Sequence, residues 1–186
     1  MIKKISSEDL SILIFKDRIA FCTLDQTLYF KLEKKNNADE LDSWIKYNNL
    51  IKKNNKCILF DSKGVVVPNK LFDVSKKNLY LSLTDDELDD KIVETNIIDP
   101  DNQVFVFSKG KNVDKIFSNS IKDLETTHFA SYLLPFLSKV SRRDLKKNIF
   151  IHLREDYFDL FIYQSSLLLL FNSYPHDNEQ DFLYYL

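Results

Sequence analysis

The chain has 186 residues, of which 26 are Lys or Arg and 28 are Asp or Glu, so its formal net charge is −2. This charge provides no basic field, and we therefore expect no nucleic-acid partner. Hydrophobic residues make up 44% of the sequence and include 15 Phe and 9 Tyr, which is enough for a packed core and excludes global disorder.

The N-terminal segment is too polar to be a targeting signal. Polar residues at positions 6–9 interrupt its apolar run, whereas a signal peptide needs a longer unbroken segment. The later apolar run Leu167–Phe171 is far shorter than the roughly 20 residues that cross a bilayer. The sequence therefore predicts a cytoplasmic protein without membrane insertion.

Three short apolar segments follow, at Leu10–Phe15, Arg18–Leu24 and Thr27–Lys34. They are rich in β-branched and aromatic residues, and short polar turns separate them. This pattern predicts a meander of three strands.

The next segment predicts an amphipathic helix that covers the meander. Asn37 and Glu40 have the spacing of a capping box, and apolar residues continue at near-helical spacing to about Lys53. A buried strand, a turn and a second strand are then expected at Lys56–Phe60, Asp61–Gly64 and Val65–Val67. Cys22 and Cys57 each lie alone in an apolar segment, which predicts buried reduced thiols rather than a disulfide or metal pair.

The middle of the chain is less regular. Val74–Leu83 is compatible with a helix or a strand, and the sequence leaves both open. Thr84 is placed to cap a helix that begins with the acidic residues 85–87. The run Thr84–Asp90 lacks the alternating ligands and the glycine of a calcium loop, so a solvated acidic face is expected. A turn at 99–102 leads into a predicted strand at Gln103–Ser108.

A core helix is predicted around Pro135. Its apolar residues follow helical spacing at Phe129, Tyr132, Leu133, Phe136 and Leu137. Pro135 must kink this helix or lie where one backbone hydrogen bond can be lost. The basic linker Ser141–Lys147 comes next, and we expect it to separate a first lobe, residues 1–141, from a second lobe, residues 142–186.

The C-terminal stretch repeats the plan of the first meander about 138 residues later. Three strand-like segments lie within Asn148–Pro175, and Asp177 is placed to cap a helix over Asp181–Leu186. Only the first turns of this helix are present in the sequence. We therefore expect the second lobe to contain three strands and the beginning of a helix, and to be incomplete.

A βββα unit that recurs after about 140 residues is the layout of the actin-like ATPase fold, which is ribonuclease H-like. The segments VPNKLFD at 67–73, FNSY at 171–174 and DFLYYL at 181–186 resemble a bacterial family, a domain of unknown function with this fold. Type IV pilus assembly ATPases are distantly similar. The resemblance implies an α/β fold with mixed sheets and two βββα-type repeats, but no mechanism.

The resemblance also identifies the turns that would bind ATP. In active members of the fold, the first hairpin of each repeat holds an Asp-x-Gly-type loop whose carboxylate positions magnesium or water. The matching turns are KDR at 16–18 and RED at 154–156, and neither contains glycine. Backbone amides approach phosphates most closely where no Cβ intervenes, so we expect that ATP hydrolysis has been lost and that no cofactor is bound.

Asp159 is the one acidic residue predicted within the strands of the second meander. It shares a strand face with Tyr157, Phe161 and Tyr163, so it lies either at a polar edge or paired within a mostly apolar layer. A structural role is favoured over a catalytic one. The three histidines, at 128, 152 and 176, are far apart in the sequence, and no metal site is predicted.

Two functions remain open, besides the weaker option that the chain is half of an actin-like ATPase domain and inert alone. The favoured one is a non-enzymatic interaction or scaffold module, a pseudo-ATPase that associates with a protein partner or with its own copies. Its predicted contact residues are the C-terminal aromatics Phe182, Tyr184 and Tyr185. The alternative is a nucleotide-binding phosphotransfer enzyme or ATPase with atypical phosphate loops. In that case ATP and magnesium would be held by Asp17, Glu155 or Asp159.

Overall fold

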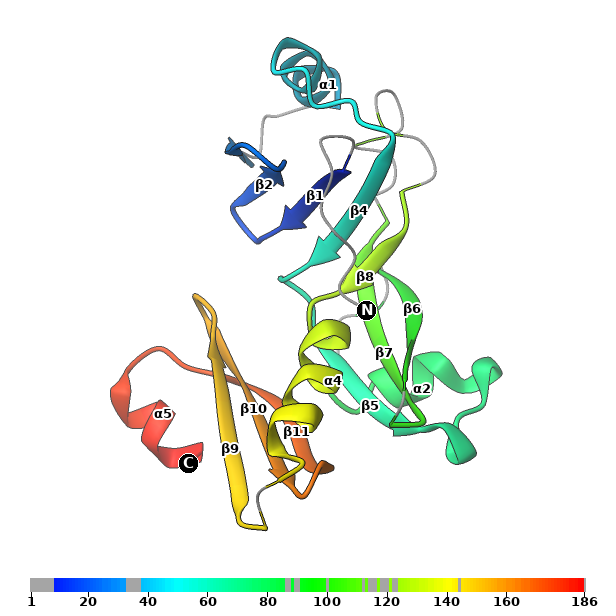
Figure 1. The fold of residues 1–186 in the computed structure, drawn as a ribbon, viewed down its shortest axis with the longest axis vertical. Helices are drawn as coiled ribbons and strands as arrows, with labels where there is room; N and C mark the ends of the chain where they lie inside the picture. The colour runs from blue at the N-terminus through cyan, green and yellow to red at the C-terminus, as the bar shows by residue number, and fades with distance from the viewer. Residues whose placement is uncertain are drawn as a thin grey trace. The chain divides into compact units, whose positions relative to one another are not determined.

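The computed structural model describes residues 9–32, 38–85, 88, 91–99, 101–111, 113, 117, 121, 124–143 and 145–185. The strands in chain order are β1 Asp9–Ile14, β2 Arg18–Cys22, β3 Thr27–Lys31, β4 Asn54–Leu59, β5 Gly64–Pro68, β6 Lys91–Ile98, β7 Gln103–Gly110, β8 Thr126–His128, β9 Lys147–Leu153, β10 Tyr157–Gln164 and β11 Leu167–Pro175. The helices are α1 Ala38–Tyr47, α2 Lys77–Leu81, α4 Ala130–Ser141 and α5 Glu179–Tyr185, with short 3₁₀ turns at Asn69–Leu71 and Val74–Lys76 (Figure 1).

The chain divides into two compact units. Unit 1 comprises Met1–Ser62, Asp89–Ile92 and Lys109–Phe129, and unit 2 comprises Lys63–Leu88, Val93–Ser108 and Ala130–Leu186. Each unit therefore draws on several separate stretches of the chain. The division into lobes at residues 141 and 142 stays a prediction.

Unit 1 contains a five-stranded mixed sheet with the strand order β3-β2-β1-β4-β8. The pairs β1–β2 and β2–β3 are antiparallel, so the predicted meander is confirmed. The pairs β1–β4 and β4–β8 are parallel. Strand β8 was not predicted because three residues are too few to show a periodic pattern.

Helix α1 covers one face of this meander but is shorter than predicted. It ends at Tyr47 rather than near Lys53 because Asn49 adopts a positive φ of 54°. The amide of Leu50 then donates to the carbonyl of Ile45, and that of Asn49 to Lys46, which is the hydrogen-bond pattern of a Schellman motif. The predicted capping residue, Asn37, lies outside the described residues.

The core of unit 1 forms between α1 and the meander. The Trp44 ring lies 5.3 Å from that of Phe21 and 5.5 Å from that of Phe30, measured between centroids. The remaining members of the buried cluster are aliphatic or aromatic side chains of the strands, the helix and later segments: Leu10, Ile12, Ile19, Leu41, Ile45, Leu50, Phe117 and Ile121. Of the two cysteines, Cys57 is buried as predicted, whereas Cys22 is only half-buried, and neither forms a disulfide.

Unit 2 contains most of one three-stranded sheet, β5-β7-β6, and the whole of another, β11-β10-β9. The strand predicted at Gln103–Ser108 is confirmed as β7, whereas β6 was not predicted because polar residues interrupt its apolar pattern. The segment left open between helix and strand is helical. The amide and hydroxyl of Thr84 both donate to the carbonyl of Leu81 at the end of α2, and residues 86 and 87 of the helix predicted after Thr84 lie outside the described residues. Asp85, expected on a solvated acidic face, is instead buried and accepts a hydrogen bond from the hydroxyl of Ser108.

Gly64 is a close-packing position at the start of β5. A Cβ atom there would lie 2.5 Å from Cε1 of the buried Phe105 ring. We therefore expect Gly64→Ala to lower the free energy of unfolding by about 1–3 kcal/mol, the usual cost of overpacking, in chemical denaturation. Gly110→Ala is the matched control, since its nearest atom would be 3.9 Å away. An equal effect of both substitutions would contradict this packing argument.

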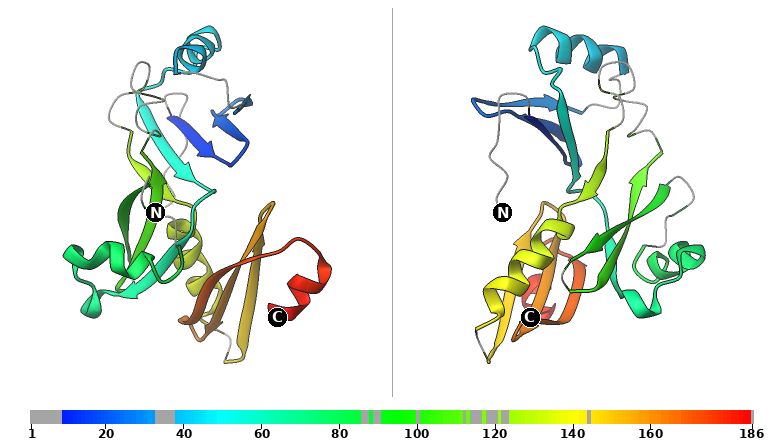
Figure 2. Two further views of the ribbon diagram at one scale, coloured as in Figure 1. Left: turned by 180° about the vertical axis from the view of Figure 1, so that it is seen from behind. Right: turned by 45° about the vertical axis from the view of Figure 1, so that its right-hand side comes forward.

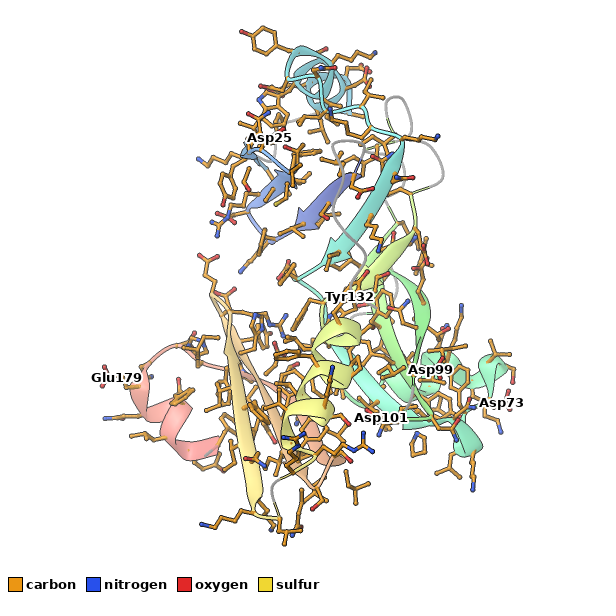
Figure 3. All side chains as sticks on the ribbon, in the orientation of Figure 1. Asp25, Asp73, Asp99, Asp101, Tyr132 and Glu179 are labelled. Carbon is orange, nitrogen blue, oxygen red and sulfur yellow. The ribbon has the colours of Figure 1, made fainter. Side chains whose placement is uncertain are left out.

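Helix α4 is confirmed, and Pro135 lies inside it, but its buried face agrees with the predicted one only in part: Phe129 and Leu137 are buried as predicted. Tyr132 and Phe136 are 45% and 60% exposed, whereas Leu134 is fully buried; Tyr132 is labelled on α4 in Figure 3. Apolar side chains line two faces of this helix, and contacts with the neighbouring sheet determine which face is buried. One such contact is the hydrogen bond that the hydroxyl of Tyr163 on β10 donates to the carbonyl of Leu134 over 3.0 Å.

The second meander, β9-β10-β11, is confirmed as an antiparallel sheet. Ser165 and Ser166 connect β10 to β11 with φ angles of 49° and 69°, the conformation typical of a tight type I′ hairpin. Helices α4 and α5 lie on opposite sides of this sheet (Figure 1, Figure 2). The helix predicted at the C-terminus is α5, but its cap is Asn178 rather than Asp177, because the Asn178 side chain accepts from the amides of residues 180 and 181. Glu179, labelled in Figure 3, is its first residue.

Candidate functional site

The two meanders repeat each other down to individual hydrogen bonds. The amide of Phe15 donates to the carbonyl of Arg18 over 2.9 Å, and the amide of Arg154 donates to that of Tyr157 over 2.8 Å. The third strands are attached in the same way, by Leu32 N–H to Asp17 C=O and by His176 N–H to Asp156 C=O. Equivalent hairpin residues are therefore 139 positions apart, close to the repeat predicted from the sequence.

The hairpin turns that correspond to phosphate loops have ordinary backbone conformations. No residue of the KDR or RED turn, all of which the structure describes, has a positive φ. Asp17 forms an ion pair with its neighbour Arg18 over 3.2 Å, and both side chains are about half exposed. Glu155 lies exposed in its turn. Neither turn thus forms a concave backbone surface of the kind that surrounds a phosphate.

Asp159 is buried in the middle of the second meander and is paired, one of the two arrangements that the sequence allowed. Its carboxylate oxygen Oδ2 lies 3.0 Å from Nδ1 of His152. The other oxygen, Oδ1, accepts from Arg154 over 2.8 Å and from the hydroxyl of Ser173 over 2.6 Å. The side chains of Asp159, His152 and Ser173 form one row because the three residues are cross-strand neighbours.

These partners keep Asp159 ionised. Burial alone would raise the pKa of this carboxyl, but the hydrogen bond from His152, the charge of Arg154 and the hydrogen bond from Ser173 together outweigh burial and hold the pKa below its usual value. Arg154 is itself fixed, with its guanidinium 5.6 Å from the centre of the Tyr157 ring. Within this cluster, the positive charge of Arg154 therefore neutralises the negative charge of Asp159.

Magnesium and ATP do not fit these residues. Magnesium requires several oxygen ligands in octahedral geometry, whereas both oxygens of Asp159 already interact with side-chain donors and Glu155 lies in an exposed turn. Within the described ranges no three His, Cys, Asp or Glu side chains are grouped so that they could hold a metal ion.

The three histidines make separate local contacts. Nε2 of His128 lies 3.0 Å from the carbonyl of Ser62, and Nε2 of His176 lies 3.2 Å from the carbonyl of Arg154. His152 contacts Asp159, as described above. Each imidazole therefore participates in the structure of its own hairpin or strand end.

The aromatic residues predicted to mediate interaction differ in their exposure. Phe182 packs 4.8 Å from the buried Phe158 ring, and Tyr185 stacks 4.4 Å from Tyr174. Tyr184 is 82% exposed. It lines an open pocket of about 380 Å³ together with Pro175, His176, Asp177, Asp181 and Tyr185. Two of the three predicted residues thus attach α5 to its own sheet, and Tyr184 is the one available to solvent.

A larger apolar surface lies on the same face of the sheet, and sequence analysis did not identify it. It consists of Ile149, Ile151 and Leu153 of β9, which are 56%, 39% and 64% exposed; we call it the β9 surface. The repeat makes Leu10 and Ile12 of β1 the equivalents of the first two, and these are only 1% and 0% exposed. No sequence signal distinguishes the two strands, because β1 and β9 carry equivalent apolar residues that differ only in their exposure.

The backbone of β9 is also accessible on one side. Among the described strands, β9 pairs with β10 alone and forms an edge of its sheet. The Arg154–Tyr157 hydrogen bond closes the hairpin, and amide directions alternate along an antiparallel strand. The N–H and C=O groups of residues 149, 151 and 153 therefore point away from β10. The β9 surface thus combines apolar side chains with the polar groups of a sheet edge.

No helix in the part of the chain that the structure describes is long and apolar enough to cross a membrane. No curated protein matches this sequence. A crystal structure from Bacteroides thetaiotaomicron, of a protein described as having an actin-like ATPase fold and unknown function, is similar to this chain. The TM-score is 0.82, the sequence identity is 18%, and the match covers 96% of this chain and 75% of that one.

The likeness to this crystal structure confirms the predicted mixed α/β architecture, an actin-like ATPase fold. The family described as "protein of unknown function (DUF3822)" matches the chain over residues 1–186. The predicted resemblance to a domain of unknown function is thereby confirmed. This chain belongs to the DUF3822 family of proteins of unknown function.

Proposed function

We propose that this chain is an interaction module that binds another polypeptide through the β9 surface and does not hydrolyse ATP. The observation that carries the proposal is the contrast between the two repeats. Side chains that are buried on β1 have exposed apolar equivalents on β9, and contiguous exposed apolar side chains on a soluble domain typically mark a binding site. Tyr184, on the helix α5 that packs on the same face of the sheet, is a further exposed aromatic side chain.

The site chemistry supports the same conclusion. Both hairpin turns lack glycine, and the carboxylate of Asp159 is engaged by three side chains. The rival function, a nucleotide-binding enzyme with atypical loops, would require these groups to release their partners. It predicts that excess Mg-ATP stabilises the fold, by about 2.7 kcal/mol at 100 times the dissociation constant.

The test compares wild type with Ile151→Lys, and the matched control is Ile97→Lys on β6, where Ile97 is 77% exposed. Wild type should increase the fluorescence of a dye specific for apolar surfaces, and Ile151→Lys should reduce this signal while Ile97→Lys retains it. Both variants should unfold within about 0.5 kcal/mol of wild type, as exposed substitutions usually do. Mg-ATP should not change the unfolding temperature.

Two results would contradict the proposed function. One is a thermal shift of several degrees with Mg-ATP, which would favour the enzyme instead. The other is a loss of stability in Ile151→Lys that is much larger than in Ile97→Lys, since the β9 surface would then belong to the protein's own core.

A further inference from the structure

One end of the second meander carries a dense group of basic side chains. Five of the nine residues at 139–147 are Lys or Arg, and one is acidic. The chain as a whole has a net charge of −2, so this segment differs in sign from the rest. Its five basic residues are all exposed, and we call them the basic patch: Lys139, Arg142, Arg143, Lys146 and Lys147.

The segments around the basic patch are held together by hydrogen bonds. The hydroxyl of Ser138 on α4 lies 3.2 Å from the carbonyl of Ser166 in the β10–β11 hairpin. The side-chain amide of Gln164 donates to the carbonyl of Leu145 over 3.1 Å. The C-terminal end of α4, the start of β9 and this hairpin therefore lie at the same end of the sheet (Figure 1).

Exposed apolar side chains lie among these charges. Leu145 is 82% exposed, and Leu167, at the start of β11, is 63% exposed. Leu167 lies opposite Gln164, which lies opposite Lys147. Because side chains directly opposite each other share one face of a sheet, the leucine and the lysine project from the same face. This end of the molecule thus presents cations and aliphatic side chains together.

Nearby carboxylates do not cancel the positive charge. Asp144 is the acidic residue of the segment. Asp101, labelled in Figure 3, lies close to the end of α4, with its Oδ1 atom 3.1 Å from the hydroxyl of Ser138. If both carboxylates are counted against the five cations, three positive charges remain. The basic patch therefore favours an anionic partner.

We propose that this end of the molecule binds the surface of an anionic phospholipid bilayer. The basic patch would lie at the level of the lipid phosphates, and Leu145 and Leu167 would enter the boundary between headgroups and acyl chains. Binding of this kind combines electrostatic attraction of Lys and Arg to anionic lipids with burial of apolar side chains. The proposal goes beyond the proposed function and uses no residue of the β9 surface.

Two other anionic partners fit these residues less well. Proteins that bind single-stranded nucleic acid place aromatic rings against the bases, whereas the apolar residues between the basic ones, Val140 and Leu145, are aliphatic. An acidic polypeptide would neutralise the cations but would leave the exposed leucines in water. A bilayer surface is the partner that accommodates both the charges and the leucines.

The test measures binding of the full chain to lipid vesicles by co-sedimentation. One set of vesicles contains phosphatidylcholine and phosphatidylglycerol in equal parts, and the other contains phosphatidylcholine alone. We expect wild type to bind the mixed vesicles, to bind the neutral vesicles much less, and to be released as salt is added, because salt screens the charges. No binding to the mixed vesicles, or equal binding to both sets, would overturn the proposal.

The double variant Arg142→Gln, Arg143→Gln removes two cations from the basic patch. Each Lys or Arg near an anionic membrane contributes about fivefold to affinity, so this variant should bind the mixed vesicles roughly 25-fold more weakly. The matched control, Lys53→Gln with Lys56→Gln, removes two exposed lysines of unit 1 and changes the net charge equally. All four side chains are exposed, so both double variants should unfold at the temperature of wild type. Equal loss of binding in both would assign it to the charge of the whole chain and overturn the proposal.

Leu145→Gln distinguishes a bilayer from other anionic partners. Binding to the mixed vesicles should fall at least about fivefold, because the variant loses the burial of an apolar side chain. Leu145→Trp should shift its indole emission to shorter wavelengths when mixed vesicles are added. Its control is Leu71→Trp, at a position that is 71% exposed in the 3₁₀ turn after β5, and this variant should show no shift.

Polyglutamate and single-stranded DNA are the competing ligands. If wild type binds either of them more tightly than the mixed vesicles at the same salt concentration, and Leu145→Gln binds it equally well, the basic patch serves an acidic polypeptide or a nucleic acid. That result would overturn the membrane proposal. It would leave the proposed function of the β9 surface unchanged, because the two surfaces have no residue in common.

Discussion

Replacing Asp159 with asparagine is expected to lower the free energy of unfolding by about 3–5 kcal/mol, the usual cost of removing one partner from a buried ion pair. The amide keeps the volume of the carboxyl, so the loss comes from charge rather than from packing. Arg154, whose side chain is 12% exposed, would keep its positive charge. Residue 159, whose side chain is 1% exposed, would no longer carry the negative charge that neutralises it. Denaturant titration of both proteins at neutral pH measures this difference.

The pH dependence provides an independent check of the same cluster. Because the partners of Asp159 hold its pKa below the unfolded value of about 3.9, its contribution to stability is complete above that value. It is lost as the pH falls through the lower pKa of the folded state. Wild type should therefore lose stability in acid more steeply than Asp159→Asn, which has no carboxyl to protonate at this position.

The control for both measurements is Asp17→Asn in the first hairpin. The Asp17–Arg18 ion pair is about half exposed, and exposed pairs contribute at most about 1 kcal/mol. If Asp17→Asn were as destabilising as Asp159→Asn, burial would not be the source of the effect. If Asp159→Asn were neutral, the cluster would not be a structural ion pair, and the carboxylate would again be a candidate for ligand binding.

The spacing of apolar residues predicted most helices and strands in which that spacing is regular. Both meanders, α1, α4 and β7 follow directly from spacing, since a strand or helix with one apolar face repeats with a fixed period. The end of α1 was missed because a left-handed asparagine at position 49, rather than any change in the apolar pattern, stops the helix. The inner face of α4 was predicted only in part, because contacts with β10 determine which of its apolar residues are buried.

The candidate site was less predictable than the fold. Sequence placed Asp159 among apolar neighbours, but only the cross-strand register brings His152 and Ser173 to the two sides of its carboxylate. The C-terminal aromatics were predicted as a contact surface, yet packing of Phe182 against Phe158 buries part of that region. The β9 surface can be recognised only by comparing the exposure of equivalent residues in the two repeats. A pattern of residues in the sequence does not contain this exposure.

Replacing Phe158 with alanine is the second substitution with a large expected effect. Its ring is fully buried and lies within aromatic contact distance of Tyr174 on β11 and of Phe182 and Tyr185 on α5. Removing it leaves a cavity beneath the helix, and buried Phe→Ala substitutions cost about 3–5 kcal/mol. For a chain of this length the unfolding temperature should fall by roughly 6–20 °C.

The matched control is Phe136→Ala on α4, where the same atoms are removed from a side chain that is 60% exposed; this should cost much less. Loss of the Phe158 ring should also release α5, which has no buried residue of its own, so limited proteolysis should cleave within 176–185 faster in Phe158→Ala than in the control. If stability falls but cleavage there does not change, α5 is held by contacts other than this aromatic cluster. In that case the structural equivalence of α5 with α1 would have to be abandoned.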